Sequence, residues 1–292
     1  MFTIVFLSLH SEIHIRRLVS SIDTKFPIII IENSKNYKLK KELEEKYKNV
    51  RILIPKKNIG FSAGFNLGIR ESKTDMVFLN SADVAFSKEC LNQLEECVKN
   101  INDFTIIGPT YEDNEIHKNY GFWDKSKLNK VSDEGIKGKY KVKEVDYIDN
   151  DFIINKKQIS DLGYFDENFF IYFETTDFCK RVRFANKKIY VCDKIKFSHF
   201  HSQSHDPKFS HQAALSRNWH YNWSKFYYFK KHINYFFALK KVAPNFFRSI
   251  KNMILSKIGK KEKKYSLHKA EFLGILYSIL NKPASYRPYE KQ

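Results

Sequence analysis

The fold is set by FTIVFLSLHSEIHIRRLVSSIDTKFPIIIIENS, residues 2–34. Two apolar runs rich in β-branched residues flank residues 12–21, where apolar side chains recur at helical spacing. Short apolar runs and helical patterns continue to alternate for about a hundred residues, which is typical of βαβ units whose helices cover one sheet. We therefore predict an α/β fold, with strands at 2–9, 27–31, 50–54 and 75–79 and helices at 12–21, 37–48 and 88–100.

The rest of the chain divides near residue 210. A strand is predicted at 104–108, a polar stretch with loops and short pairing strands follows to about residue 143, and two strands are predicted at 188–191 and 195–199. From about His211 the composition changes to aromatic and basic residues in a helical pattern. This predicts a first domain at 1–210 and a basic, aromatic-rich helical extension at 211–292.

The chain of 292 residues carries a formal net charge of +18. Such an excess attracts an anionic partner, and nucleic acid, an acidic membrane face and a phosphorylated small molecule all remain open. The four cysteines lack a CxxC spacing, so we expect neither disulfides nor a zinc site.

The apolar start MFTIVFLSL has no basic residue before it and no small-residue cleavage site after it, which favours a buried strand over a signal peptide. No apolar run has the length of a membrane span. We expect a cytoplasmic protein, with peripheral attachment to the inner face of the plasma membrane left open. The aromatic and basic residues of the tail either dock on anionic lipid or pack with their aromatic rings buried on the first domain.

Polar residues follow the predicted strands at 8–11, 32–34, 55–60 and 80–83. Ligands of open α/β sheets bind beyond the carboxyl ends of the strands, so a ligand is expected to contact these residues. Asp83 suits Mg²⁺ or Mn²⁺, which prefer oxygen ligands and bridge diphosphate oxygens. A simple turn or helix cap is the alternative.

Glycine is dense in NIGFSAGFNLGI, which we interpret as a loop that leads into a helix. Glycine permits close approach of the backbone to a ligand or to a neighbouring element, and both interpretations remain open here. The segment matches neither the Walker loop nor the GxGxxG dinucleotide fingerprint.

Glu174 and Asp177 lie in GYFDENFFIYFETTDFCKR, residues 163–181, at the start of a predicted helix. Their spacing places both carboxylates on one helix face, which suits general base chemistry. The alternative is helix-end electrostatics with an ion pair between Asp177 and Arg181. His199 ends a predicted strand at the start of a histidine-rich stretch, where it either contacts a metal or diphosphate or is hydrogen-bonded in a loop.

The order of these motifs resembles a family 2 glycosyltransferase of the GT-A fold, close to the rhamnosyltransferase-like branch, over about residues 2–205. The matching residues, in chain order, are Ser8 to Ser11, Glu32, Asn33, Ser34, Asn58, Gly60, Phe61, Gly64, Asn66, Ser81, Ala82, Asp83, Gly163, Phe165, Asp166, Glu167, Phe169, Phe170, Glu174, Asp177, Cys179, Arg181, His199 and Ser204. Ser81 replaces the first carboxylate of the family's metal motif. Thr175 stands where relatives often carry a second carboxylate.

The resemblance implies a central mixed sheet flanked by helices, with a C-terminal helical extension. It implies inverting transfer of a sugar from a nucleotide-diphosphate donor to a hydroxyl of a glycan or lipid-linked acceptor, in cell-surface polysaccharide synthesis. Glu174 is the implied base and Asp177 the alternative, because threonine cannot serve as a base. The other implied site residues are Ser8, Glu32, Asn58, Gly60, Asn66, Ser81 and Asp83 for the donor, Asp166, Glu167 and Tyr172 for the acceptor, and Asp83 with His199 for Mg²⁺ or Mn²⁺.

Two further functions are kept as alternatives. A degenerate transferase that binds donor or acceptor without turnover would account for Ser81 and Thr175. A nucleic-acid-binding protein would use the charge for phosphate contacts and the interleaved aromatic residues for base stacking, although the sequence has no RNP motif, zinc finger or recognition-helix pattern.

Overall fold

The computed structural model describes residues 1–101, 103–111, 118–124, 142–199 and 207–289. The chain forms two compact units. Unit 1 comprises Met1–Ile59, Ala63–Phe165 and Thr175–His205, and unit 2 comprises Gly60–Ser62, Asp166–Glu174 and Asp206–Gln292. Unit 2 therefore combines two short segments from the first two thirds of the chain with the C-terminal helices.

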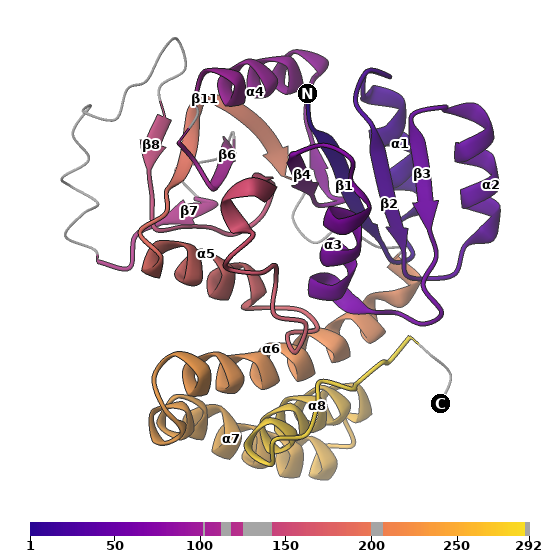
Figure 1. The fold of residues 1–292 in the computed structure, drawn as a ribbon. Helices are drawn as coiled ribbons and strands as arrows, with labels where there is room; N and C mark the ends of the chain where they lie inside the picture. The colour runs from indigo at the N-terminus through magenta and orange to yellow at the C-terminus, as the bar shows by residue number, and fades with distance from the viewer. Residues whose placement is uncertain (102, 112–117, 125–141, 200–206, 290–292) are drawn as a thin grey trace. The chain divides into compact units, whose positions relative to one another are not determined.

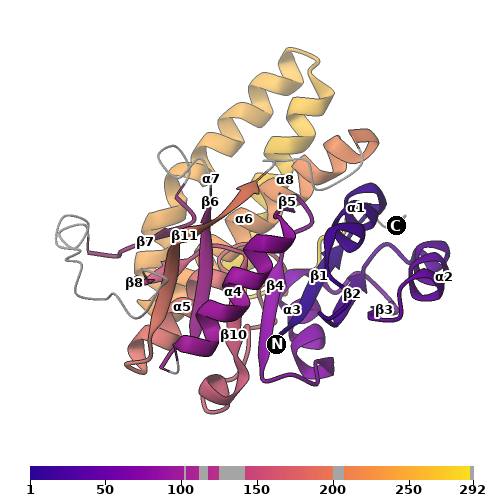
Figure 2. The ribbon, with the colours of Figure 1, turned by 90° about the horizontal axis from the view of Figure 1, so that it is seen from above.

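Unit 1 contains a mixed sheet of nine strands in the order β3-β2-β1-β4-β10-β6-β11-β5, with β8 paired to β11 (Figures 1 and 2). The strands are β1 (Thr3–Ser8), β2 (Ile28–Glu32), β3 (Val50–Leu53), β4 (Met76–Asn80), β5 (Val84–Ala85), β6 (Ile106–Tyr111), β8 (Val142–Glu144), β10 (Phe152–Asn155) and β11 (Ile189–His199). The first four strands run parallel, and β10 is antiparallel to β4 and β6. Two short strands, β7 (Tyr120–Gly121) and β9 (Tyr147–Ile148), pair separately.

The helices associated with this sheet are α1 (Glu12–Ser21), α2 (Tyr37–Lys46), α3 (Gly60–Glu71), α4 (Lys88–Asn100) and α5 (Glu174–Phe184). The predicted N-terminal strands and helices are confirmed to within two residues. The strands predicted at 188–191 and 195–199 are instead one strand, β11, whose pairing with β6 shifts register between Cys192 and Lys196. The polar residues Asp193 and Lys194 at this irregularity break the apolar run, which made one strand look like two.

Alternating residues of β1 face opposite sides of the sheet. Ile4 and Phe6 belong to a core that also contains buried residues of α1, α2 and α4, and Figure 2 shows α4 lying along this face. Val5 approaches α3 on the other side, where a Cβ on Gly68 would lie 2.3 Å from Cγ1 of Val5. Glycine at this position therefore lets α3 pack closely on the sheet.

The segment NIGFSAGFNLGI leads into a helix as predicted, and the helix begins early in it. Because α3 begins at Gly60, Gly64, Asn66 and Gly68 lie within a helix. Gly64 and Gly68 allow close packing of α3 against Leu7 and Val5 of β1, which supports the packing interpretation for these two glycines.

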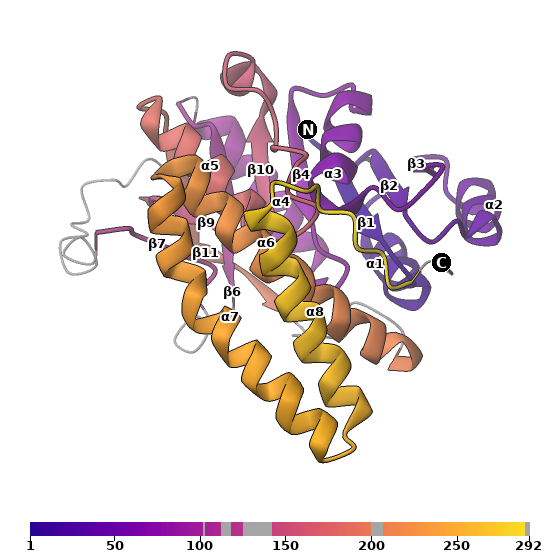
Figure 3. The same ribbon diagram turned by 90° about the horizontal axis from the view of Figure 1, so that it is seen from below.

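Unit 2 is built on α6 (Ser210–His232), α7 (Tyr235–Ile258) and α8 (Glu262–Ile279), and Figure 3 shows α7 and α8 side by side, joined by a short turn. Trp219, Trp223, Phe226 and Tyr228 of α6 are buried. These four rings cannot stack on bases, so they no longer support the nucleic-acid-binding alternative. Among the described helices, none combines the length and apolar character needed to cross a membrane.

Candidate functional site

Two polar side chains end the neighbouring strands β1 and β2. Ser8 and Glu32 are paired in register, and both are fully buried. The backbone N–H of Ser34 donates to Oε1 of Glu32 at 2.7 Å, and the Ser34 hydroxyl donates to the same oxygen. Burial raises the pKa of Glu32, although hydrogen bonds from Ser34 and Ser8 act in the opposite direction. The parallel register therefore places a carboxylate and a hydroxyl side by side at the carboxyl edge of the sheet.

Asn33 connects this edge to the residues before α3. Its backbone N–H donates to the carbonyl of Ser8 at 2.8 Å, and its side-chain oxygen accepts from the N–H of Ile59 at 3.1 Å. Asn58, the residue before Ile59, is buried. Three motifs that are far apart in the sequence thus meet within unit 1.

A second polar cluster lies where β4 ends and β10 begins. The backbone N–H of Ser81 donates to Oδ1 of Asp151 at 2.7 Å, and the hydroxyl of Tyr111 donates to Oδ2. Asp151 is buried and has a φ of 59°, a left-handed conformation that residues other than glycine seldom adopt. Asp151 therefore holds the backbone at the start of the loop that contains Asp83.

The carboxylates of this cluster are unusually basic. Desolvation raises the pKa of Asp151 to about 7; the charge of Asp83 also raises it, whereas hydrogen bonds from Tyr111 and Ser81 lower it. Desolvation likewise raises the pKa of Asp149 to about 6. A site that already concentrates negative charge in a desolvated place favours a cation or a proton.

Asp149, Asp151 and Tyr111 were missed in the sequence analysis. The available signal was the acidic triplet DND at 149–151, directly before the apolar run of β10. Its meaning depends on β10 pairing antiparallel to β4, because only that direction brings the start of β10 to the end of β4. The backbone of His199 reaches the same region, since His199 is the register partner of Val84, which follows Asp83. Ser204 and the other residues at 200–206 lie outside the described residues, and His211 lies in α6.

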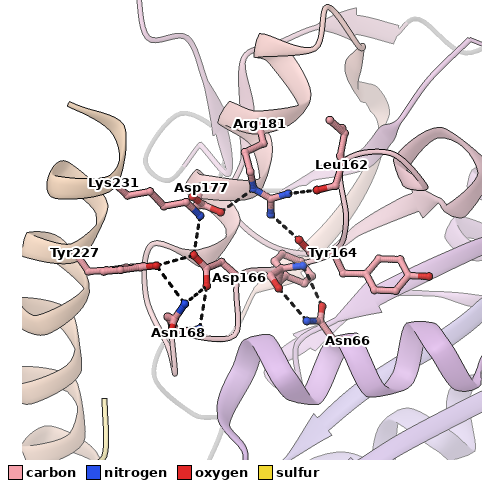
Figure 4. A network of polar contacts seen from close by, with 10 residues as sticks. Asn66, Leu162, Tyr164, Asp166, Asn168, Asp177, Arg181, Tyr227 and Lys231 are labelled. Atoms are coloured by element: carbon pink, nitrogen blue, oxygen red, sulfur yellow. Dashed lines mark hydrogen bonds and ion pairs between the residues drawn. The ribbon is translucent and has the colours of Figure 1, made fainter. Parts of the chain in front are cut away.

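Asn66 joins α3 to the segment that precedes the candidate base. Its side-chain nitrogen donates to the carbonyl of Phe165 at 2.9 Å, and its side-chain oxygen accepts from the N–H of Phe165 at 3.0 Å (Figure 4). This pair of buried hydrogen bonds occupies the amide with a neighbouring backbone. The geometry thus gives Asn66 a positioning role.

Asp177 and Arg181 form a second support for the same segment. Asp177 is fully buried and accepts from Nε of Arg181 at 3.0 Å. Arg181 also donates to the carbonyls of Leu162 and Tyr164, at 2.9 and 2.6 Å (Figure 4). The ion pair predicted from the spacing of the two residues is therefore present, and it orients the chain just before Phe165.

In unit 2, Asp166 ties the segment Asp166–Glu174 to α6. Oδ2 of Asp166 accepts from the Tyr227 hydroxyl at 3.0 Å and from Nζ of Lys231 at 2.7 Å, and Oδ1 accepts from the N–H and side-chain amide of Asn168 (Figure 4). Burial acts to raise the pKa of Asp166, but the bonds to Lys231 and Asn168 outweigh it and the pKa is lowered. Asp166 is thus an ionised anchor, whereas Glu167 is exposed.

Two residues directly before Glu174 adopt the left-handed conformation. Tyr172 has a φ of 74° and Phe173 a φ of 67°. Such backbone costs of order 1–3 kcal/mol per residue and persists where surrounding contacts impose it. Here both rings pack against Tyr221 of α6, with centroids 5.8 and 5.4 Å apart. Glu174, the buried first residue of α5, therefore follows a strained turn that aromatic packing supports.

Gly60 meets the same segment within unit 2. Its φ is 80°, and a Cβ at this position would lie 2.5 Å from the carbonyl oxygen of Phe170. The N–H of the next residue, Phe61, donates to that oxygen at 2.7 Å. Close packing against Phe170 explains why glycine is needed at position 60.

Comparison with known families identifies this arrangement. The model of glycosyl transferase family 2 matches residues 12–191, which is more than half of the chain. The chain belongs to glycosyl transferase family 2. A curated relative, the low-salt glycan biosynthesis hexosyltransferase Agl10 of Haloferax volcanii, is 26% identical over 206 residues. The match covers 68% of this chain and 66% of that relative, just under two thirds of its length.

Solved structures show the GT-A fold of this family member. The mannosyltransferase PcManGT from Pyrobaculum calidifontis, in complex with GDP-Man and Mn²⁺, aligns with a TM-score of 0.56 at 9% identity, over 96% of this chain and 87% of that chain. GalNAc-T7 with UDP, GalNAc and Mn²⁺ aligns with a TM-score of 0.55 at 12% identity, over 80% and 52% of the two chains. Residues 1–349 of S. aureus TarS align with a TM-score of 0.51 at 13% identity, over 96% and 92%. The predicted mixed sheet flanked by helices is thereby confirmed.

The oxygen ligands available where β4 ends suit a hard divalent ion whose remaining ligands come from a substrate. Within the described residues, no group of three or more His, Cys, Asp or Glu side chains is placed to hold a metal by itself. Mg²⁺ in phosphate sites commonly uses one or two carboxylates and completes its shell with substrate oxygens and water. Asp83 would supply such a carboxylate, and the register of β11 places the backbone of His199 beside the same loop.

Proposed function

We propose that this chain transfers a sugar from a nucleotide-diphosphate donor to a hydroxyl group, with inversion at the sugar carbon. The observation that carries the proposal is the edge of the unit 1 sheet. There, Ser8 and Glu32 end paired strands, and the Ser81–Asp83 loop follows the next strand of the sheet, β4. Family membership and the sugar nucleotides named in the solved relatives point to the same donor class.

Roles for the donor side follow from chemistry and position. Glu32 can accept a hydrogen bond from the nucleoside, and Ser8 can donate or accept one. Asn58 lies in the segment bound to Asn33, and Ser81 follows β4, which pairs with β1. Asp83, together with His199, would hold Mg²⁺ or Mn²⁺, which when bound neutralises the charge of the diphosphate leaving group. Asp151 contributes by holding the Ser81–Asp83 loop, whereas the contacts of Asn66 and Gly60 position the chain around Phe165 and Phe170.

Roles for the acceptor side rest on α5 and the segment before it. An inverting displacement needs a base that removes the proton of the acceptor hydroxyl as that oxygen attacks the sugar. We assign this base to Glu174. Asp177, already engaged with Arg181, orients the neighbouring chain. Glu167 and Tyr172 are proposed to contact the acceptor, while Asp166 anchors their segment to α6.

The acceptor, the domain division and the cellular location are also part of the proposal. A glycan or lipid-linked acceptor in cell-surface polysaccharide synthesis fits a transferase of this family whose curated relative is named for glycan biosynthesis. The division into a catalytic domain at 1–210 and a helical extension at 211–292, and the likeness to the rhamnosyltransferase-like branch, are parts of this proposal. Attachment to the inner face of the plasma membrane is proposed from the basic tail.

The test is binding followed by transfer. The full chain is screened for thermal stabilisation by UDP, GDP and dTDP, each with Mn²⁺ or Mg²⁺, because a ligand that binds only the folded state raises its stability with affinity. We expect one nucleotide to stabilise the chain, with the shift reduced by EDTA and by Asp83→Asn. The matching sugar nucleotide is then assayed for transfer. No stabilisation by any of the three would contradict the proposal, and binding without transfer or donor hydrolysis would favour the degenerate transferase.

A further inference from the structure

Helix α7 has one buried face and one apolar face that is open to solvent. Ala238, Val242, Ser249 and Ser256 are buried, and the first two belong to a core cluster that contains Phe226 of α6 and Ile275 of α8. The outward apolar residues, with their exposed fractions, are Phe236 (80%), Phe247 (68%), Ile254 (56%) and Ile258 (75%). Their spacings of eleven, seven and four residues correspond to about three, two and one helical turns, so they line one side of the helix.

This outward face is framed by positive charge. α7 contains no Asp or Glu. The exposed lysines on α7 and on the turn that joins it to α8 are Lys240, Lys241, Lys251, Lys257, Lys260 and Lys261. Residues 211–292 contain seventeen Lys and Arg against three Glu, so a formal charge of +14 out of the chain's +18 lies in this part. The apolar face of α7 is thus set in the most basic region of the sequence.

We propose that the outward face of α7, defined by Phe236, Phe247, Ile254 and Ile258 with its flanking lysines, docks on a bilayer of anionic phospholipid. A helix with an apolar stripe and lysines beside it lies in the plane of the interface, with the apolar side chains among the acyl chains and the ammonium groups among the headgroups. The proposal rests on the membrane attachment put forward above and names the surface that makes it. It narrows the sequence-based expectation for the whole tail to one helix, because Trp219, Trp223, Phe226 and Tyr228 of α6 are buried.

Charge and side-chain type select this partner. Two copies of α7 placed face to face would bring their lysines together without a single acidic residue from either helix, which disfavours a dimer through this surface. Nucleic acid would satisfy the charge, but only Phe236 and Phe247 of this face carry rings for base stacking, and they are eleven residues apart on the helix. Aliphatic side chains between lysines instead match a surface that is anionic outside and apolar beneath.

The experiment uses flotation of the full chain with vesicles of phosphatidylcholine, with and without phosphatidylglycerol, in the absence of any sugar nucleotide. We expect flotation with the acidic vesicles only, weakened by salt. The triple variant Phe247→Ser, Ile254→Ser, Ile258→Ser should lower the vesicle partition coefficient by about tenfold or more, because each change removes apolar area from the bilayer contact. Lys240→Glu, Lys251→Glu, Lys257→Glu should lower it to a similar degree.

Matched controls are available in unit 1. Ile13→Ser with Phe184→Ser removes two side chains that are 76% and 75% exposed, and Lys38→Glu with Lys41→Glu reverses exposed lysines on α2. Both controls should float like the unaltered chain. Undiminished flotation of the α7 variants, or equal losses in the controls, would overturn the assignment to α7. The assignment would also be overturned by a dimer in solution that the triple variant dissociates, or by a complex with an oligonucleotide in a chain that does not float. Failure of the unaltered chain to float would remove the membrane attachment as well, while nucleotide stabilisation would still test the donor site separately.

Discussion

Polar groups are held in different ways in two regions of the molecule. One is the cluster in unit 1 where β4 ends and β10 begins, and the other is the segment Asp166–Glu174 of unit 2. In unit 1, Asp151 is bound by a backbone N–H and a tyrosine hydroxyl, both uncharged, and its pKa is raised to about 7. In unit 2, Asp166 has an ammonium partner in Lys231, and its pKa is lowered. Burial acts in the same direction on both carboxylates. Asp166 is also less buried than Asp151, so weaker desolvation and the charge of Lys231 together keep it ionised.

The difference also concerns how each region is built. The positions of Ser8, Glu32 and Ser81 follow from the register of β1, β2 and β4. Many backbone hydrogen bonds maintain this register, so it does not depend on any one side chain. The segment before Glu174 depends on a few side chains, chiefly Asp166 with its partners on α6 and the rings around Tyr221. Single substitutions should thus affect the second region more strongly than the first.

The largest effect is expected at the end of the unit 2 segment. Glu174→Gln keeps the shape of the side chain but removes the base, so transfer should fall by about 10²- to 10⁴-fold while nucleotide binding is unchanged. Initial rates and the nucleotide-induced shift in Tm are measured on the same samples.

Asp177→Asn is the control for this substitution on the same helix. It leaves Arg181 without its ionised partner, so it should lower the free energy of unfolding by about 3 kcal/mol. Normal turnover in Glu174→Gln combined with complete loss in a stably folded Asp177→Asn would reverse the two assignments.

A smaller effect is expected from breaking the anchor on α6. Asp166→Asn should lower the free energy of unfolding by about 2 kcal/mol at neutral pH, because hydrogen bonds to a charged group are lost. Folding lowers the pKa of Asp166. Its contribution to the free energy of unfolding is therefore complete above the ordinary pKa of an aspartate, and it is lost as the pH falls through the pKa in the folded state. The difference between variant and unaltered chain, measured by urea unfolding, should therefore shrink in acid.

Asp161→Asn is the matched control, because Asp161 also pairs with a lysine but its side chain is 62% exposed. Its effect should stay within about 0.5 kcal/mol. Equal losses in the two variants would show that Asp166 is an ordinary surface ion pair.

An effect with the opposite dependence on pH is expected at Asp151. Its folded pKa of about 7 exceeds the ordinary value of 3.8, so the folded state holds a proton that the unfolded chain releases. Stability should fall as the pH rises from about 4 to 7 and level off above, and Asp149 adds to the same trend.

Asp151→Asn removes the larger part of this slope, so the free energy of unfolding of the variant, relative to that of the unaltered chain, should increase as the pH rises from about 5 to 7. Urea unfolding between pH 5 and 8 in the presence of EDTA measures the slope without bound metal. An unchanged slope in the variant would show that Asp151 is ionised throughout this range.

The sequence alone was sufficient for the parallel strands, their helices and the order of the family motifs, because apolar periodicity and short-range spacing are local properties. It also predicted the ion pair of Asp177 with Arg181, which lies within one helix, and it proposed Asp83 and Glu174 from their places beside a strand end and at a helix start. It could not distinguish binding from positioning at Gly60 and Asn66, whose partners Phe170 and Phe165 are about a hundred residues away. The same limit hid Asp151, because only the antiparallel pairing of β10 with β4 brings it to Ser81. The buried side of each tail helix also lay beyond the sequence, because it depends on the helices packed against it. Trp219 of α6 is buried, whereas Phe247 and Ile258 of α7 are exposed.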